Sequence, residues 1–361
     1  MLSQENHFEQ AERELLTLNV SRALALFNLA EARGWDPDLC AAGRWECHML
    51  LGDFEGAWCE SDQISSRGKP DPNRFWDGHP LENKRVLIRC LHGFGDTVQF
   101  IRYAPLVRNI ARHLTIEAQP AMKGLLRDSE IADEVITWGE IEPAWDSQVE
   151  VMELPRIFRT TIETIPREVP YLRVRGAPLR GTRALSDRLK AGVVWNSSTF
   201  NPARSIPIEK FAAIFSLPGV DFCALQYGPE YKEAAPWRAV VRDLHTELIT
   251  IEDSARAMCG LDLVITVDTM AAHMAGALSV PVWTLLPYQC DWRWMLHRND
   301  SPWYPTMRLF RQSAPGDWDS VVERVRTELT ALTATVHRNR SNELFVRGRH
   351  GEVNCGPLVD N

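Results

Sequence analysis

The sequence predicts an α/β protein with two parallel-sheet domains that follow a short block of helices. Three observations predict this class. The first 70 residues carry apolar side chains at helical spacing and contain no run typical of a strand. From residue 85 onward, short β-branched runs alternate with helical segments, which is the pattern of βα units. The alternation stops at a link near 176–182 and begins again at residue 191, so we expect two such domains.

The first 74 residues are expected to form four short helices. Three apolar positions recur 34 residues later, so that Leu16, Val20 and Ala23 correspond to Leu50, Phe54 and Ala57. This spacing is the period of the tetratricopeptide repeat, and it predicts two helical hairpins of that type. Two hairpins are too few for a stable array. We therefore expect four large apolar side chains to be buried against each other and against the first α/β domain: Phe27, Trp45, Phe54 and Trp58.

The chain divides into four segments. Residues 1–74 are the helical block, 75–181 the first α/β domain, 182–335 the second, and 336–361 a flexible tail without periodicity. The second domain is expected to end with an amphipathic helix over 317–333. In each domain the first strand leads into a loop at the carboxyl edge of the sheet, where open α/β sheets bind ligands. A cleft between the domains that takes an extended ligand is therefore predicted.

Composition and charge exclude several classes of protein. The 361 residues include 40 basic and 48 acidic side chains, a net charge of −8, so no overall positive field attracts nucleic acid or an anionic membrane. No run approaches the 18 apolar residues of a membrane span, and the N-terminus is polar, so we expect a cytoplasmic protein without a transmembrane segment. The eight cysteines form no C-x-x-C pair, and we expect them to be reduced.

The first candidate site is LHGFGDT, residues 91–97, between a buried strand and the start of a helix. Gly93 and Gly95 permit close approach of a ligand to the backbone, and Asp96 lies at the mouth of the turn. Asp96 is either a cap of the helix or a general base. A dinucleotide-binding fingerprint needs a third glycine at position 98, which is valine here, and this disfavours a nicotinamide cofactor.

The second candidate site is VITVDTMAAHMAGAL, residues 264–278. An apolar strand runs into Asp268 and Thr269 and then into a helix of small residues. The N–H groups and dipole of that helix start suit a diphosphate. His273 lies on the same helix face as Thr269, either as a ligand of the site or as a core histidine.

Two further segments are polar or aromatic. The loop 195–207 ends near Arg204, which either clamps phosphate oxygens or is solvated. The segment 287–312 is rich in tryptophan, and its rings either stack on a sugar or base or belong to the core, the latter being expected for Trp294 and Trp303. The sequence has no H-E-x-x-H motif, metal-spaced His/Cys set, Walker loop or G-x-S-x-G motif, so we expect neither a metal site nor a bound cofactor.

Three stretches of the chain carry a resemblance to a known family. They are RFWDGHPLENKRVLIRCLHGFGDTVQFIRYAPL, LDLVITVDTMAAHMAGALSVPVWTLLP and CDWRWMLHRNDSPWYPTMRLFRQ, which lie within residues 74–312. They resemble the signature blocks of tetratricopeptide-linked glycosyltransferases of family 9, relatives of the ADP-heptose:lipopolysaccharide heptosyltransferases. The resemblance implies a GT-B fold with a nucleotide-sugar donor held mainly by the second domain. It also implies an acceptor approached from the first domain, inversion at the anomeric carbon and no metal.

The resemblance also assigns roles to single positions. It implies that Asp96 is the catalytic base and that Arg204 contacts the donor diphosphate. Donor contacts are further implied for Asp268, Thr269 and His273, and Gln226 matches a position near the ribose or base. Contacts to the acceptor or within the loops are expected for His92, Gly93, Gly95, Tyr288, Asp291 and Trp292. The first loop departs from the A-E-Q-G-L-G-D of these relatives, because His92 replaces their glutamine.

The resemblance implies an inverting, metal-independent glycosyltransferase. Its acceptor is a hydroxyl of a glycan, a lipid-linked glycan or a protein, which leaves lipopolysaccharide and exopolysaccharide biosynthesis and protein glycosylation open. Two alternatives remain. One is a catalytically silent nucleotide- or glycan-binding scaffold whose helices bind a partner. The other is a GT-B nucleotide-sugar epimerase, which activates water in place of an acceptor.

Overall fold

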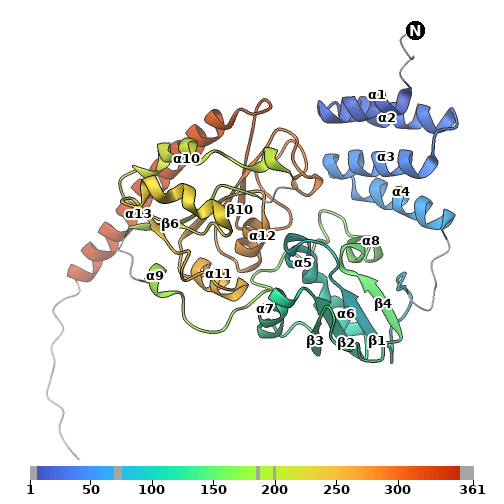
Figure 1. Ribbon diagram of the computed structural model, residues 1–361, viewed down its shortest axis with the longest axis horizontal. Coiled ribbons are helices and arrows are strands. Elements are labelled where there is room, and N and C mark those ends of the chain that lie inside the picture. Colours follow the sequence, from blue (N-terminus) through green and yellow to red (C-terminus); the bar gives the residue numbers. More distant parts are fainter. Residues whose placement is uncertain (1–5, 69–74, 184–187, 198–200, 350–361) are drawn as a thin grey trace, which may run out of the picture.

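The computed structural model describes residues 6–68, 75–183, 188–197 and 201–349. Figure 1 shows a helical block beside two α/β parts, and each part contains its own sheet. The block consists of α1(His7–Leu16), α2(Val20–Ala32), α3(Pro37–Leu51) and α4(Phe54–Arg67). The second helices of the two hairpins begin at Val20 and Phe54, which are the positions that the 34-residue spacing relates.

Local sequence explains where these helices start. Asn6, Asp36 and Asp53 accept backbone hydrogen bonds at the starts of α1, α3 and α4. Pro37 occupies the first turn of α3, where its missing N–H costs nothing. Gly52 ends α3 with a φ of 77°, a left-handed conformation that glycine adopts without strain.

The first sheet is parallel throughout and has the order β3-β2-β1-β4. Its strands are β1(Arg85–Arg89), β2(His113–Ala118), β3(Glu134–Thr137) and β4(Ser147–Glu150). The helices of this part are α5(Phe94–Phe100), α6(Ala104–Ile110), α7(Lys123–Asp128) and α8(Leu154–Ile157). The sequence did not predict β4, because its SQVE stretch is short and has one β-branched residue.

The second sheet is also parallel and has the order β10-β9-β8-β5-β6-β7. Its strands are β5(Leu189–Val194), β6(Val220–Ala224), β7(Val241–Asp243), β8(Leu263–Val267), β9(Val282–Leu286) and β10(Met307–Arg311). Its helices are α9(Arg180–Arg183), α10(Ile208–Phe215), α11(Ile251–Met258), α12(Met270–Ala277) and α13(Trp318–Arg349). Short 3₁₀ helices connect the elements of both parts: η1(Ile101–Tyr103), η2(Pro120–Met122) and η3(Val151–Glu153) in the first, and η4(Pro202–Arg204), η5(Pro229–Trp237) and η6(Trp292–Trp294) in the second.

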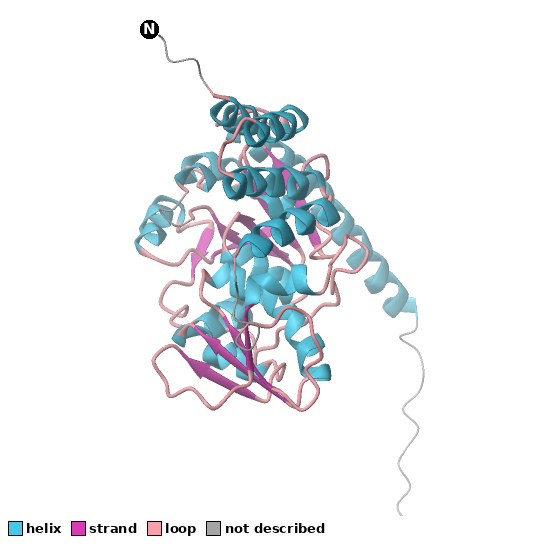
Figure 2. Cartoon of the chain, turned by 90° about the vertical axis from the view of Figure 1, so that its right-hand side faces the viewer, coloured by secondary structure: helices cyan, strands magenta, loops and turns pink. Residues whose placement is uncertain are grey.

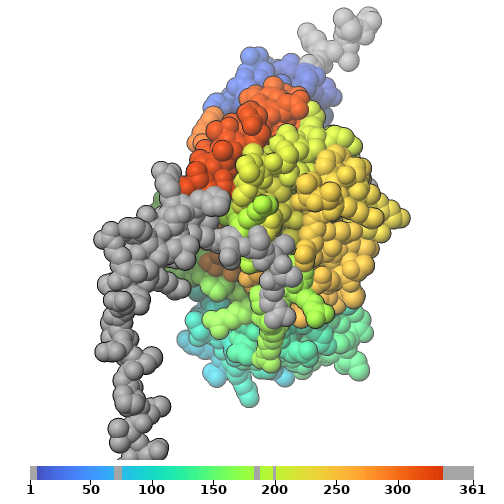
Figure 3. Space-filling view, turned by 90° about the vertical axis from the view of Figure 1, so that its left-hand side faces the viewer, coloured from blue at the N-terminus to red at the C-terminus, as the bar shows by residue number. Residues whose placement is uncertain are grey.

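The last helix is longer than the sequence analysis predicted. It was expected to end near residue 333, with a flexible tail over 336–361, but α13 continues to Arg349. The stretch 334–347 contains neither glycine nor proline, so no helix breaker stops it there. The remainder of the predicted tail, 350–361, lies outside the described residues. Figure 3 shows α13 on the second α/β part, which adjoins the first part below it.

The helical block packs on both α/β parts and not on the first alone. Toward the first part, the indole Nε1 of Trp58 donates to the Thr160 carbonyl at 2.7 Å. Toward the second part, the backbone N of Leu296 donates to the Leu50 carbonyl at 2.8 Å. Figure 2 shows the block at the top of the view, in front of the second sheet and above the first. Of the four aromatic residues expected to be buried, Phe54 and Trp58 belong to the large core that includes the first part, and Phe27 is buried within the block. Trp45 is only partly buried.

The predictions for the core tryptophans and the cysteines can be compared with the structure. Trp294 and Trp303 are fully buried, as predicted for core residues. The seven described cysteines are all free thiols, although Cys59 and Cys259 are exposed; Cys355 lies in the part not described. In the described part of the chain, no helix combines the length and apolar character that crossing a bilayer requires.

Candidate functional site

The candidate site lies where the carboxyl end of β1 meets the carboxyl end of β8. The loop after β1 leads into α5, and Asp268 and Thr269 connect β8 to α12. These two helices touch at Gly95, where an added Cβ would lie 3.2 Å from Cδ2 of His273 and 3.8 Å from Cα of Met270. The lack of a side chain at Gly95 therefore permits the close approach of two helices from different parts of the fold.

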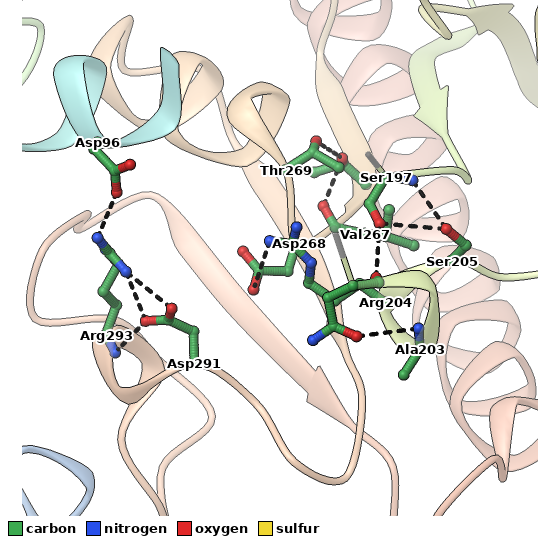
Figure 4. Close-up of polar contacts among 12 residues, drawn as sticks. Asp96, Ser197, Ala203, Arg204, Ser205, Val267, Asp268, Thr269, Asp291 and Arg293 are labelled. Carbon is green, nitrogen blue, oxygen red and sulfur yellow. Dashed lines mark hydrogen bonds and ion pairs between the residues drawn. The ribbon is translucent and has the colours of Figure 1, made fainter. Parts of the chain in front are cut away.

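Asp96 lies in the first turn of α5 and points toward the second α/β part (Figure 4). Its Oδ2 accepts a hydrogen bond from the Gly93 N–H at 3.0 Å. Its Oδ1 accepts a hydrogen bond from Nη2 of Arg293 at 2.5 Å. The cap expected from the sequence is thus present, and in addition the carboxylate forms an ion pair across the two parts. The Asp96 side chain remains 27% exposed, so a ligand can reach it.

Arg293 is the residue of this site that the sequence analysis did not single out. Its side chain is 9% exposed, and its Nη1 donates to both carboxylate oxygens of Asp291 at 2.9 Å. The guanidinium also lies 4.6 Å from the ring centroid of Trp292 and 5.3 Å from that of Phe100. The only local signal for such an arrangement was the D-W-R-W spacing, which places an acidic residue two positions before the arginine. One guanidinium therefore joins two carboxylates from different parts of the chain.

Tyr288 and Trp292, both expected as acceptor or loop contacts, lie against the helical block. The hydroxyl of Tyr288 donates to the Thr17 carbonyl at 3.4 Å. The ring of Trp292 lies between Trp45 of α3 and Phe100 of α5, at centroid distances of 5.1 and 6.2 Å. Asp291, by contrast, faces Arg293 and is part of the site.

Asp268 and Arg204 form the second half of the site. Asp268 is 3% exposed, and its Oδ2 lies 3.8 Å from Nη1 of Arg204. Within the part of the chain that the structure describes, Oδ2 of Asp268 and Nε of Arg204 have no hydrogen-bond partner. Burial raises the pKa of Asp268 to about 6, and the nearby Asp291 adds to this while Arg204 opposes it. The loop after β5 and the end of β8 thus present a buried acid beside a cation whose Nε–H has no partner among the described residues (Figure 4).

The raised pKa of Asp268 leads to a prediction about stability. Asp268→Asn is expected to raise the free energy of unfolding near pH 7.5, by up to about 3 kcal/mol. Between the ordinary pKa of 3.8 and the folded value of about 6, the folded state keeps a proton that the unfolded state has released. Stability therefore falls as pH rises through this interval and stays lower above it. An amide has no charge and avoids this loss.

Urea unfolding of the native protein and of Asp268→Asn, near pH 4 and near pH 7.5, measures the effect. The two proteins should differ much less near pH 4, where the folded carboxyl is protonated and the unfolded one has released its proton only in part. An equal difference at both pH values contradicts the prediction.

Thr269 and His273 hold the start of α12 in place. Thr269 is the N-cap, and its Oγ1 accepts a hydrogen bond from the Ala271 N–H at 3.2 Å. His273 is buried, its Nδ1 lies 2.9 Å from the Tyr304 hydroxyl, and its ring stacks on Trp294. Burial, with Arg293 and Arg102 nearby, lowers the pKa of His273 well below its usual value, so the ring is neutral near pH 7. His273 thus has the contacts of the core histidine that the sequence analysis kept as an alternative.

Both the oxygen and the nitrogen of the Gln226 side-chain amide form hydrogen bonds with backbone groups. Its Oε1 accepts hydrogen bonds from the N–H groups of Trp195 and Asn196, at 3.2 and 3.0 Å. Its Nε2 donates to the carbonyls of Asn196 and Tyr227, at 3.3 and 3.1 Å. A glutamine amide has two donor hydrogens and two acceptor lone pairs, so all four are engaged. Gln226 therefore ties the end of β6 to the loop after β5, the loop that leads to Arg204.

His92 lies at the carboxyl edge of the first sheet. Its side chain is more than half exposed, and Nε2 lies 3.8 Å from Oε1 of Glu150 at the end of β4. Burial raises the pKa of Glu150. The backbone carbonyl of His92 accepts a hydrogen bond from Gln119 at 2.7 Å, which fixes the start of the glycine loop. Among the residues that the structure describes, no group of three or more His, Cys, Asp or Glu is arranged to hold a metal ion.

Comparisons with known proteins add information on the fold. No family model matches the chain. Protein FlbA of Caulobacter vibrioides is 25% identical over an alignment of 332 residues, and the alignment covers 80% of this chain and 54% of that protein. The chain thus spans about half the length of the curated relative it matches.

Two of the solved structures that match the chain are glycosyltransferases. One is a glycosyl transferase family 9 protein from Veillonella parvula, with a TM-score of 0.50 and 14% identity over 72% of this chain and 99% of that one. Another is the E. coli ADP-heptose lps heptosyltransferase II, with a TM-score of 0.49 and 15% identity over 70% of this chain and 99% of that one. The likeness to the Veillonella protein, together with the two parallel sheets, confirms the predicted fold class of a GT-B type α/β protein preceded by a helical block.

Proposed function

We propose that the protein is an inverting, metal-independent glycosyltransferase of the family 9 type. It moves a sugar from a nucleoside-diphosphate donor to a hydroxyl of a glycan, a lipid-linked glycan or a protein. One observation carries the proposal: α5, with an accessible carboxylate at Asp96, touches the start of α12, beside which Asp268 and Arg204 lie. An acceptor on the first part and a donor on the second would then meet between these groups.

The proposed chemistry needs a base and an anion site. Asp96 accepts one hydrogen bond at each oxygen, so each oxygen keeps a lone pair for the proton of an attacking hydroxyl. Such a general base contributes a rate factor of about 10² to 10⁴. The leaving diphosphate gains negative charge, which the start of α12 and the guanidinium of Arg204 stabilise. Because these groups supply the positive charge, the proposal requires neither a metal nor a cofactor.

A thermal-shift screen against ADP-, GDP-, UDP- and dTDP-sugars, run in excess EDTA, tests the proposed function. One nucleotide class should raise the melting temperature, since a ligand at 100 times its dissociation constant adds about 2.7 kcal/mol of stability. Product analysis of the donor alone separates a transferase from an epimerase, which converts the donor without an acceptor. Activity that depends strictly on added Mg²⁺ or Mn²⁺ contradicts the proposal. If no donor and acceptor pair gives turnover, the result favours the alternative of a catalytically silent scaffold.

Arg204→Ala is expected to weaken binding of the free nucleoside diphosphate by about 1.5 to 3 kcal/mol, the range for hydrogen bonds to a charged group. The guanidinium has a buried Nε without a hydrogen-bond partner among the described residues, so a phosphate oxygen can take a bond that no protein atom uses. Calorimetry measures the change. Lys210→Ala serves as the control, because Lys210 pairs with Asp319 on the surface of the same part and its loss should leave binding unchanged. Equal affinities in the two variants refute this role of Arg204.

A further inference from the structure

We propose that the helical block sets the position of Asp96 through Trp292 and Arg293, which makes the block part of the catalytic apparatus. This inference rests on the proposed function for its kinetic consequence. Occupancy or distortion of the block would then change turnover without any contact between the block and the substrates.

Arg293 contacts both ends of α5. Nη2 of Arg293 binds Oδ1 of Asp96 at 2.5 Å, and the guanidinium lies over the ring of Phe100, the last residue of the same helix. Both ends of α5 therefore contact one side chain. A carboxylate held at one oxygen by Arg293 and at the other by the Gly93 N–H has little freedom to rotate.

Two tryptophans, Trp292 and Trp303, support Arg293. Its backbone carbonyl accepts a hydrogen bond from Nε1 of Trp303 at 3.1 Å, and its guanidinium lies 4.6 Å from the ring centroid of Trp292. Trp292 stacks on Phe100, and Trp303 meets the same Phe100 ring edge to face at 5.8 Å. The two tryptophans thus contact Arg293 and the end of α5 at the same time, so a shift of either ring moves both.

Two aromatic side chains of the helical block contact these tryptophans. Trp45 of α3 contacts Trp292 edge to face at 5.1 Å, and Phe54 of α4 contacts Trp303 in the same manner at 5.9 Å. The two helices of the second hairpin, α3 and α4, therefore each support one of the two tryptophans. An aromatic cluster of Trp45, Phe54, Phe100, Trp292 and Trp303 connects the block to α5 without a gap. Close-packed interiors transmit displacement, because neighbouring side chains have no free volume to absorb it.

Trp45→Ala is the variant that tests the connection. It removes the ring that supports Trp292. The substitution itself alters neither Asp96 nor Arg293, nor any residue of the loops that face the substrates. The turnover number should fall by a factor between about 2 and 30, the range for coupling through packed side chains. The Michaelis constant for the nucleotide sugar should stay unchanged, because Arg204 and α12 are not affected. Trp45→Phe, which keeps an aromatic ring at this position, should restore most of the turnover.

Trp35→Ala is the matched control. Trp35 lies between α2 and α3 and stacks on Phe8 within the block, at 5.2 Å. Its removal is the same change in the same block, so it should lower the melting temperature while leaving turnover unchanged. Equal losses of turnover in the two alanine variants would mean that the block acts only through stability, and this result overturns the proposal.

A double variant and a measurement without substrate complete the test. Trp45→Ala combined with Arg293→Gln should be no slower than Arg293→Gln alone, because without the Arg293 guanidinium Asp96 has already lost the side chain through which the block holds it. Hydrogen–deuterium exchange of the peptide that contains α5 should be faster in Trp45→Ala than in Trp35→Ala. Equal exchange in the two variants overturns the connection even if the native protein shows no transferase activity. Faster exchange with no activity in the native protein instead overturns only the proposed function.

Discussion

Asp96→Asn is expected to lower turnover at least about 100-fold while leaving folding and donor affinity almost unchanged. The substitution removes the proton acceptor and hardly changes the volume of the side chain. The amide oxygen can still accept the hydrogen bond of the Gly93 N–H, and Arg293 keeps its bonds to Asp291. The loss should therefore appear in the chemical step. Initial rates at saturating donor and acceptor measure it.

Asp300→Asn is the matched control for this substitution. Asp300 pairs with Arg298 at 2.9 Å and is largely exposed, so the change removes one carboxylate from an ion pair outside the site. Its turnover should equal that of the native protein. Equal turnover in Asp96→Asn and Asp300→Asn would end the assignment of Asp96 as the base.

Deletion of residues 1–70 is expected to cause aggregation or to lower the melting temperature by more than about 5 °C. The deletion exposes the rings of Trp292 and Trp303, which Trp45 and Phe54 cover in the full chain. Exposure of a large apolar side chain costs about 1.5 to 3 kcal/mol, so the loss of this cover is a large part of the stability of a domain. Differential scanning calorimetry and light scattering of the truncated and full chains measure the two outcomes.

If the block only recruits the acceptor, a different result is expected. The truncated protein would then keep its melting temperature and donor affinity and lose only transfer to the native acceptor. A soluble truncation with unchanged melting temperature, and unchanged transfer to a small acceptor, contradicts the structural role and assigns the helices to partner binding.

Strands in the middle of the two sheets could be predicted from the sequence because they are buried on both faces. β1 and β8 appear as continuous apolar runs for this reason, and the polar residues that follow them fall at the carboxyl edges. The edge strands β4, β7 and β10 were not predicted. β7 has three residues with only one buried, and a short edge strand depends on its neighbour for pairing and not on its own pattern.

The sequence by itself determined that Asp96, Arg204, Asp268 and Thr269 follow the carboxyl ends of strands, because strand ends are marked by local sequence. Only the tertiary structure decided which of these residues meet. Arg293 reaches Asp96 across 197 positions of the chain, and no periodicity or motif spacing encodes a contact of that range. The partners of Trp292 likewise come from α3 and α5, two helices that the sequence placed in separate units. Local patterns fix where a residue lies on its own element, whereas contacts between elements depend on how complete surfaces pack.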